Sequence, residues 1–367
     1  MSVSRINIVL FGIGNVGSTL ISQVIESQNF FLEKRNIELR FPIITNSTLA
    51  FFEKDGLKNQ WEANFAQSAI PYTIDDIIQY VQEQQLENLI AVDATASEEI
   101  IKNYIPLIQN GFNFVAANKK ANTLHTEFYK ELRRNLKKFD KNFLYETNVG
   151  AGLPVVNTIN ELYNSGEKIT SIRGVFSGSL SYIFNRFSNE DNTFSSILND
   201  AEKLGLTEPD SREDLSGNDI ARKLLILARE IGLELEFSHI KIKSLLLPEL
   251  NETNSKANYS INKSLFDKPF QIAKITQSDN HVLRYVGELD IDTQSLEVKL
   301  ISEPRESALG QLKGADNIIE IYTKSYSDIP IVIQGAGAGR AVTARGVLTD
   351  VLKIAQKIKI KEAVWQQ

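Results

Sequence analysis

The stretch RINIVLFGIGNVG, residues 5–17, is the strongest indication of the fold in the sequence. Its first half is apolar enough for a buried strand, and its second half fits the pattern G-x-G-x-x-G through Gly12, Gly14 and Gly17. The first glycine of that pattern makes a tight turn, the second lets a pyrophosphate approach the backbone, and the third allows close helix–strand packing. Apolar residues at 16, 20, 21, 24 and 25 then form one helical stripe. This order predicts a dinucleotide site at the helix start; the alternative is a tight glycine turn with no ligand.

Alternating strands and helices continue along the first 145 residues. We expect strands at 37–45, 88–94 and 112–118, and helices at 74–84, 98–109 and 126–138. Strands alternating with helices form βαβ units with right-handed crossovers and a parallel sheet. The pattern of residues 1–145 therefore predicts an α/β, Rossmann-type, doubly wound domain that binds NAD(P).

The pattern changes after residue 145. The candidate strands SIRGVFSG, RYVGELDI, LEVKLISE and NIIEIYT favour a second, α+β domain with an antiparallel or mixed sheet over 146–330. Residues 331–367 read as a strand, the glycine run GAGAG and a helix, which we expect to return to the first domain. The glycine run lacks the G-x-G-x-x-G spacing, so a ligand contact and a plain turn remain equally open.

Composition excludes several kinds of chemistry. The 367 residues contain no cysteine and three histidines, which rules out a thiol nucleophile and disulfides and disfavours a zinc site. The net charge of −6 argues against a nucleic-acid partner. No apolar run approaches the ~20 residues of a membrane span, so we expect no membrane association and a cytoplasmic protein. Lysines, carboxylates, hydroxyls or a bound cofactor must then carry the chemistry.

The end of the second strand bears on the choice of cofactor. An NAD-specific site places a carboxylate there to bind the ribose 2′-hydroxyl. The strand instead ends in Thr45, Asn46 and Ser47, and the carboxylate of Glu38 lies at its start. This favours NADP or dual use, although no arginine follows directly to hold a 2′-phosphate.

Two stretches, VDATAS (92–97) and AANKKA (116–121), follow predicted parallel strands at the edge where open α/β sheets bind ligands. Lys119 is accordingly a candidate active-site cation, with an ordinary solvated loop lysine as the alternative.

The densest polar segment is GLTEPDSREDLSGNDIARKLLILARE, residues 205–230. Asp219 and Lys223 are four residues apart and therefore neighbours on a helix. The pair is either a surface ion pair or a lysine in a cleft that exchanges a proton with a substrate hydroxyl. The spacing alone leaves both interpretations open. The segment ETNVGAGLP (146–154) similarly allows either a plain turn or carbonyls that face a cation.

Six motifs together resemble the homoserine dehydrogenase family over essentially the whole chain. They are FGIGNVG, ANKKA, YETNVGAGLP, GVFSGSLSYIFN, GLTEPDSREDLSGNDIARKLLIL and GAGAGRAVTARGVLTDVLKIA. The forms TNVGAGLP and SGSLSYIF are most similar to the dehydrogenase half of the bifunctional aspartokinase–homoserine dehydrogenases. No kinase half precedes Met1 and no regulatory domain follows the last helix, so we expect a stand-alone or an excised enzyme.

The resemblance implies reversible, NAD(P)H-dependent reduction of L-aspartate 4-semialdehyde to L-homoserine, on the route to threonine, methionine and isoleucine. It implies Lys223 as the catalytic acid and base, Lys119 as a second active-site lysine near the cofactor, and a homodimer or higher oligomer. Substrate-binding positions are Glu208, Asp214, Asp219, Gly178 and Ser179. Cofactor positions are Gly12, Ile13, Gly14, Asn15, Val16, Gly17, Thr95, Lys119 and Gly339. The backbone carbonyls of Glu146, Val149, Ala151 and Leu153 match a site for a monovalent cation, sodium or potassium.

Two other classes remain as alternatives. A related amino-acid dehydrogenase on the same fold would show no homoserine-dependent rate. A non-catalytic dinucleotide-binding regulator would lack the lysines and carboxylates of the second domain, and this chain retains them.

Overall fold

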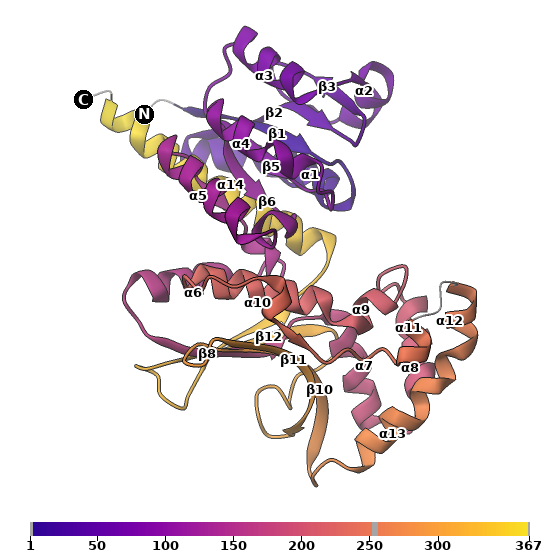
Figure 1. Ribbon diagram of the computed structural model, residues 1–367. Helices are drawn as coiled ribbons and strands as arrows, with labels where there is room; N and C mark the ends of the chain where they lie inside the picture. The colour runs from indigo at the N-terminus through magenta and orange to yellow at the C-terminus, as the bar shows by residue number, and fades with distance from the viewer. Residues whose placement is uncertain (1–2, 252–255, 366–367) are drawn as a thin grey trace. The chain divides into compact units, whose positions relative to one another are not determined.

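A computed structural model describes residues 3–251 and 256–365. The chain divides into two compact units, one of residues Met1–Gly152 with Gly339–Gln367 and one of residues Leu153–Ala338 (Figure 1). The first unit is therefore built from two separate stretches of the chain.

The first unit is organised around a seven-stranded sheet in its described residues, in the order β4-β3-β2-β1-β5-β6-β7. The strands β2, β1, β5, β6 and β7 run parallel to one another, which confirms the predicted parallel α/β sheet. Its strands are β1 (Ser4–Phe11), β2 (Ile37–Thr45), β3 (Leu49–Phe52), β4 (Ile70–Pro71), β5 (Leu89–Asp93), β6 (Asn113–Ala116) and β7 (Phe143–Leu144). Its helices are α1 (Asn15–Arg35), α2 (Trp61–Ser68), α3 (Ile74–Glu83), α4 (Tyr104–Gln109), α5 (Thr126–Lys138) and α14 (Arg340–Trp365).

Two antiparallel strands extend this sheet beyond the elements that we predicted. The side chain of Asn46 accepts hydrogen bonds from the N–H groups of Thr48 (2.9 Å) and Leu49 (2.7 Å), which turns the chain back on itself after β2. Asparagine commonly forms such turns by bonding to the backbone two or three residues ahead. The strand β3 then pairs antiparallel with β2, and β4 pairs with β3.

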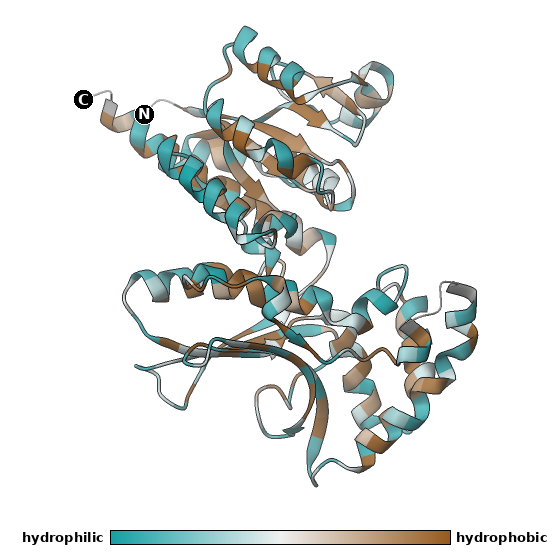
Figure 2. Ribbon diagram, in the orientation of Figure 1, coloured by the Kyte–Doolittle hydropathy of each residue, from teal (hydrophilic) through white to brown (hydrophobic). Residues whose placement is uncertain are grey.

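The C-terminal helix α14 completes the core of the first unit. Val347, Val351 and Ile354 are fully buried there, and α14 packs against α1. Burial of one such aliphatic side chain contributes about 1.5–3 kcal/mol. In Figure 2 the central strands of this unit are mostly hydrophobic, whereas much of α5 is hydrophilic.

The second unit contains a six-stranded mixed sheet in its described residues, in the order β13-β12-β8-β10-β11-β9. Neighbours pair antiparallel except β11 with β9, which agrees with the predicted α+β domain. The strands are β8 (Ile169–Val175), β9 (Lys241–Ile242), β10 (His281–Asp290), β11 (Ser295–Pro304), β12 (Asp316–Thr323) and β13 (Ile331–Ala336).

The segment 331–367, which the sequence predicts to return as a whole to the first domain, is divided between the two units. The strand β13 pairs with β12 from Ile331 to Ala336 and belongs to the second unit. Only α14, which follows Gly339, belongs to the first. The pairing of two adjacent strand candidates in an antiparallel ladder explains why the strand stays with the second sheet.

Helices of the second unit pack on its sheet and on one another. They are α6 (Val155–Asn164), α7 (Gly178–Asn189), α8 (Phe194–Lys203), α9 (Arg212–Ser216), α10 (Asn218–Glu230), α11 (Pro248–Asn251), α12 (Lys256–Asn262) and α13 (Asp267–Ile275). The helix α10 lies against β10 and β11. At Gly287 of β10 a Cβ atom would lie 2.9 Å from Ile220 and 3.0 Å from Leu224, so this glycine allows the close approach of α10. No helix in the described ranges is long and apolar enough to cross a membrane.

Candidate active site

The glycine turn between β1 and α1 has the close packing that its sequence predicts. Gly12 adopts a φ of +93°, a conformation that favours glycine, and its N–H donates to the carbonyl of Thr45 (2.9 Å). A Cβ atom on Gly17 would collide with the carbonyl oxygen of Gly12. A Cβ atom on Gly14, by contrast, would meet nothing within 4 Å. The turn is thus closed on its inner side and open at the position where a pyrophosphate is expected to approach.

The remaining predicted positions of this turn lie at the start of α1. Asn15 and Val16 are the first two residues of the helix, and Ile13 lies within the turn. No side chain caps this helix end. The first N–H groups of a helix have no partner within the helix, and together with the helix dipole they bind anions. The geometry therefore fits the phosphates of a dinucleotide.

The end of β2 carries no carboxylate. The Asn46 side-chain oxygen is used in the turn to β3, and the hydroxyl of Tyr72 lies 3.2 Å from both the Thr45 hydroxyl and the Asn46 carbonyl. Glu38, at the start of the strand, forms ion pairs with Arg5 (3.2 Å) and Arg40 (2.9 Å). Burial is the largest single influence on the pKa of Glu38 and raises it. The hydrogen bonds and charges of Arg40 and Arg5 together outweigh burial, so the pKa of Glu38 is lowered.

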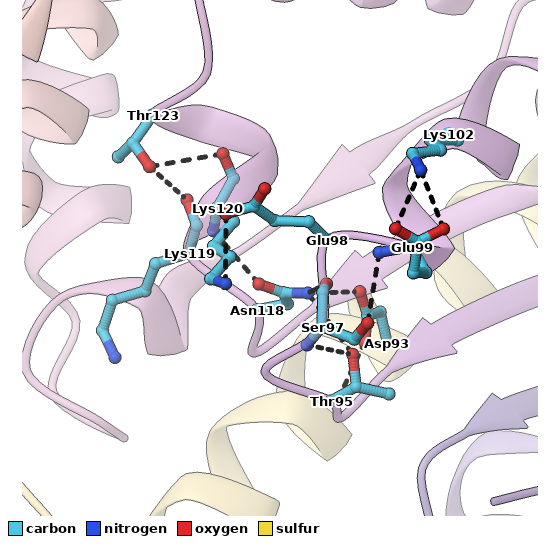
Figure 3. Close-up of polar contacts among 10 residues, drawn as sticks. All are labelled: Asp93, Thr95, Ser97, Glu98, Glu99, Lys102, Asn118, Lys119, Lys120 and Thr123. Atoms are coloured by element: carbon cyan, nitrogen blue, oxygen red, sulfur yellow. Dashed lines mark hydrogen bonds and ion pairs between the residues drawn. The ribbon is translucent and has the colours of Figure 1, made fainter. Parts of the chain in front are cut away.

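Asp93, the last residue of β5, is a fully buried carboxylate with several donors around it (Figure 3). Its oxygens accept hydrogen bonds from the Tyr104 hydroxyl (2.6 Å), the Asn118 amide (2.9 Å) and the N–H of Thr95 (2.8 Å). Burial raises the pKa of Asp93, and these hydrogen bonds oppose the rise. Sequence reasoning had placed Thr95 at the site but had missed Asp93 and Asn118.

Lys119 follows Asn118 directly, after the end of β6. It is half-buried, and Figure 3 shows its side chain leaving the loop away from Asp93. Thr95 lies under the glycine turn, since a Cβ atom on Gly12 would be 2.9 Å from its methyl group. The loops after β5 and β6 and the turn after β1 thus meet at the carboxyl edge of the sheet, which is the edge predicted for Thr95 and Lys119.

The segment from Glu146 to Ala151 is held tightly within the first unit. The N–H of Glu146 donates to the buried carboxylate of Asp350 on α14 (2.9 Å). The amide of Asn148 donates to the carbonyl of Ala116 (2.8 Å). Ala151 has a φ of +52°, which is uncommon for a residue other than glycine. A backbone in this conformation turns its carbonyls in directions that helix and sheet do not use.

Three of the four predicted cation ligands, Glu146, Val149 and Ala151, lie in this segment, and Leu153 is the first residue of the second unit. The Glu146 carbonyl accepts from the N–H of Val149 (3.3 Å), and the Leu153 carbonyl accepts from the N–H of Val155 (2.9 Å). A carbonyl oxygen carries two lone pairs, so one hydrogen bond does not by itself exclude contact with a cation. Among the residues the structure describes, no group of three or more His, Asp or Glu side chains is placed to hold a metal ion.

The second unit places Lys223 of α10 in a buried polar site. Its side chain is 9% exposed, and its Nζ donates to the carbonyl of Phe176 (2.7 Å) and contacts the Asp219 carboxylate (2.7 Å). The amide of Asn317 on β12 donates to the same Phe176 carbonyl (3.0 Å). An exposed surface ion pair would leave both side chains in solvent. Here the Lys223 side chain is buried and only the Asp219 side chain is half-exposed, so that interpretation does not fit. Sequence reasoning had missed Phe176 and Asn317, since a backbone acceptor and a single asparagine carry no motif.

Asp214 of α9 links the loop before that helix to the start of α7. One oxygen of its carboxylate accepts from the Ser179 hydroxyl (2.6 Å) and the other from the N–H of Glu208 (2.9 Å). Burial raises the pKa of Asp214 and the nearby charge of Asp219 adds to this, whereas the two hydrogen bonds lower it. Hydrogen bonds to Asp214 therefore join three of the predicted residues of the second unit, Ser179, Asp214 and Glu208, and the ion pair of Asp219 with Lys223 joins two more.

Gly178 is the first residue of α7, and its predicted role depends on close approach of the backbone. A Cβ atom there would lie 2.9 Å from the carbonyl of Ala315, so the position suits glycine. Ser177 caps the helix by accepting from the N–H of Leu180 (3.3 Å). The last predicted cofactor position, Gly339, immediately precedes α14 in the first unit and has a φ of +125°.

Family models match both parts of the chain. A family model described as homoserine dehydrogenase matches residues 154–352, and one described as the NAD-binding domain of homoserine dehydrogenase matches residues 12–146. The chain is 37% identical to the homoserine dehydrogenase of Saccharomyces cerevisiae, covering 98% of this chain and 100% of that protein. It is 36% identical to a bifunctional aspartokinase/homoserine dehydrogenase of Haemophilus influenzae, over 96% of this chain. It spans only 43% of that longer protein's length.

Solved structures show the same fold. A Candida auris protein of unknown function superimposes with a TM-score of 0.88 at 31% identity, covering 96% of this chain and 99% of that one. A hyperthermophilic archaeal homoserine dehydrogenase in complex with NADPH gives a TM-score of 0.72 at 23% identity, covering 96% and 98%. At that identity the likeness establishes the fold alone.

A nucleotide-binding sheet with an open glycine turn, together with a second unit carrying a buried lysine and carboxylates, defines an NAD(P)-dependent oxidoreductase. Both family models and the full-length similarity to the yeast protein identify the family. The chain belongs to the homoserine dehydrogenases.

Proposed function

We propose that the protein catalyses the reversible reduction of L-aspartate 4-semialdehyde to L-homoserine with NADPH, in the route to threonine, methionine and isoleucine. The observation that carries this proposal is the buried Lys223, held between the Phe176 carbonyl and the Asp219 carboxylate. A lysine that is removed from solvent and fixed by two acceptors is suited to exchanging a proton with a single bound hydroxyl.

Lys223 supplies the proton in this proposal. In the oxidative direction its amine accepts the hydroxyl proton of homoserine as the C–H hydrogen leaves as hydride. In the reductive direction its ammonium returns that proton to the oxygen of the aldehyde, where negative charge develops. The bound nicotinamide supplies the hydride acceptor or donor. Proton and hydride together balance the conversion of a primary alcohol to an aldehyde.

The carboxylates of the second unit bind the amino-acid end of the substrate. Glu208 is exposed at its loop and presents an anionic partner for the substrate ammonium. Asp214 and Ser179, which are hydrogen-bonded to each other, hold the loop of Glu208 against the start of α7. Gly178 lets the backbone approach the substrate at the same helix end.

The first unit holds the cofactor through Ile13, Asn15, Val16, Thr95, Lys119 and Gly339 around the glycine turn of Gly12, Gly14 and Gly17. We favour NADP, with NAD as the second choice. The absence of a carboxylate at the end of β2 supports this, because an anionic side chain there would repel a 2′-phosphate. The neighbouring Ser47 and Thr48 are exposed and carry hydroxyls suited to a phosphate.

A monovalent cation, sodium or potassium, belongs to the same proposal. The positive φ values of Gly150 (+78°) and Ala151 (+52°) give the Glu146–Ala151 backbone an irregular course, and backbone carbonyl oxygens are ligands that hard cations accept. Thr147 supports this choice, because its buried hydroxyl has no hydrogen-bond partner among the described residues.

We further propose a cytoplasmic enzyme that works as a homodimer or a higher oligomer, since symmetric dimers are the commonest assemblies of such proteins.

The proposal is tested by following the absorbance of reduced nicotinamide with homoserine and either NADP or NAD, each with sodium, potassium or neither. We expect homoserine-dependent reduction that is faster with NADP and is stimulated by one of the cations. Light scattering on the same sample checks the oligomer. Reduction that requires a different amino alcohol and ignores homoserine would identify a related amino-acid dehydrogenase instead.

A further inference from the structure

Asp93 occupies the point at which three strand ends of the first unit meet. It is the last residue of β5, and its side chain is fully buried. Its backbone carbonyl accepts from the N–H of Ala117 (2.9 Å), and the next residue, Ala94, donates to the carbonyl of Phe11 at the end of β1 (2.9 Å). The carboxylate therefore lies beneath both the glycine turn and the loop that carries Lys119.

Asn118 joins the loop after β5 to the loop after β6. Its amide nitrogen donates to the Asp93 carboxylate (2.9 Å) and to the carbonyl of Ser97 (2.8 Å), and lies 3.4 Å from the Thr95 hydroxyl. Its amide oxygen accepts from the N–H of Lys120 (3.1 Å). Figure 3 shows this amide between the two loops, with the Lys119 side chain projecting from the far side of its own loop. The Asn118 side chain thus bonds to the backbone of Lys120, just after Lys119, and ties Asn118, just before Lys119, to the loop after β5.

A buried carboxylate is costly unless donors surround it, so its persistence here needs a reason. The Tyr104 hydroxyl (2.6 Å) anchors Asp93 from the helix side, but that contact reaches neither loop. The contacts that face the ligand edge are the Thr95 N–H and the Asn118 amide. Thr95 is itself a proposed cofactor position, and Asn118 directly precedes another, Lys119.

We propose that Asp93 is a positioning residue for the nicotinamide cofactor, acting through Asn118 and the Thr95 backbone to set the places of Lys119 and Thr95. This inference rests on the proposed cofactor role of those two residues. It concerns binding of the dinucleotide, and it does not depend on which amino-acid substrate the enzyme uses.

The substitution Asp93→Asn separates the contacts of this carboxylate. An asparagine can still accept from the Thr95 N–H with its oxygen, and its amide can donate to the Tyr104 oxygen. It then presents N–H groups to the N–H groups of Asn118, so this one link is broken. Asn118→Ala breaks the same link from the other end without adding a polar group.

Tyr104→Phe is the matched control. It removes a hydrogen bond from the same carboxylate, at an equally buried position, but leaves both loop contacts in place. We expect it to lower the melting temperature and to leave NADPH affinity within about twofold of the unsubstituted protein. A loss of cofactor affinity in this variant equal to that of Asp93→Asn would show that Asp93 acts only through general stability.

NADPH binding to the full chain, followed by the fluorescence of the reduced nicotinamide, decides the question. We expect Asp93→Asn and Asn118→Ala each to raise the Kd for NADPH about tenfold, which corresponds to about 1.4 kcal/mol. An unchanged Kd in either folded variant overturns the proposal; if Asp93→Asn does not fold, Asn118→Ala decides alone. Because no homoserine is present, failure of the proposed reaction would leave this result interpretable.

Discussion

At the scale of single residues, Lys223 decides whether the proposed chemistry occurs. Its Nζ is held 2.7 Å from both the Phe176 carbonyl and the Asp219 carboxylate, inside the second unit. We expect Lys223→Ala to leave NADPH binding unchanged, because the glycine turn belongs to the other unit. Turnover should fall by at least about a hundredfold, the usual contribution of a general acid or base.

Steady-state rates with homoserine, beside a binding titration with NADPH, check this expectation. Lys203→Ala is the control, because Lys203 is an exposed lysine at the end of α8 in the same unit. Wild-type turnover in Lys223→Ala would remove Lys223 from the mechanism.

Asp214 gives a pH-dependent prediction at the same scale. Burial raises its pKa in the folded protein, so the folded state binds a proton more readily than the unfolded chain does. The contribution to stability is therefore present at low pH and is lost as the pH rises through the raised pKa. We expect wild-type stability to decline relative to Asp214→Asn as the pH is raised from the acid range to neutrality. Urea unfolding of both proteins across that range measures the difference, and a difference that grows in the opposite direction would contradict the assignment.

At the scale of elements, the β1–α1 turn makes opposite demands on two glycines. Ala at Gly17 would collide with the carbonyl of Gly12, so we expect Gly17→Ala to lose about 1–3 kcal/mol of stability and to bind NADPH poorly. Gly14 has a φ of −72° and open space around its Cβ position, so Gly14→Ala should fold normally.

The Gly14→Ala variant should nevertheless weaken NADPH binding, because its methyl group occupies space that the pyrophosphate needs. Thermal melts and NADPH titrations of both variants separate the two effects. Normal NADPH affinity in Gly14→Ala would place the phosphates somewhere other than this turn.

Elements also show which parts of the fold were predictable. The predicted elements of the first unit follow from hydrophobic periodicity, because each buries an apolar face or a whole strand; they are β1, α1, β2, α3, β5, α4, β6 and α5. The β3–β4 extension depends on one asparagine side chain turning the chain after β2, and no periodic pattern records such a turn. The strand β13 was expected beside the first domain but pairs with β12, because strand pairing is decided by tertiary contacts.

The candidate site divides in the same way. The glycine turn and the Asp219–Lys223 spacing are local patterns, and the sequence predicts both. The acceptor carbonyl of Phe176, the amide of Asn317 and the Asp93–Asn118 link join residues far apart in the chain. Only the folded structure brings those groups together.

At the scale of the whole molecule, the nucleotide-binding unit is discontinuous, since α14 returns to it after the entire second unit. A chain ending at residue 338 would lack Val347, Val351 and Ile354 and would expose the apolar residues that they cover, so we expect it to bind no NADPH. A Cβ atom on Gly152 would lie 2.8 Å from the carbonyl of Val342. The end of the stretch 1–152 and the start of the stretch 339–367 therefore lie close together in the first unit.

We therefore expect residues 1–152, joined by a short Gly/Ser linker to 339–367, to fold and to bind NADPH without catalysing turnover. Circular dichroism and an NADPH titration test this, with the chain 1–152 alone as the control. Equal binding by 1–152 alone would contradict the role given to α14.

The reaction that we propose moves a hydride between C4 of homoserine and a nicotinamide. The most direct test supplies NADP and homoserine carrying deuterium at both C4 positions, and examines the reduced cofactor by mass spectrometry. We expect that one deuterium is transferred to each nicotinamide that is reduced, and that Lys223→Ala forms almost none of this product. Reduced cofactor without deuterium, or no homoserine-dependent reduction at all, would contradict it.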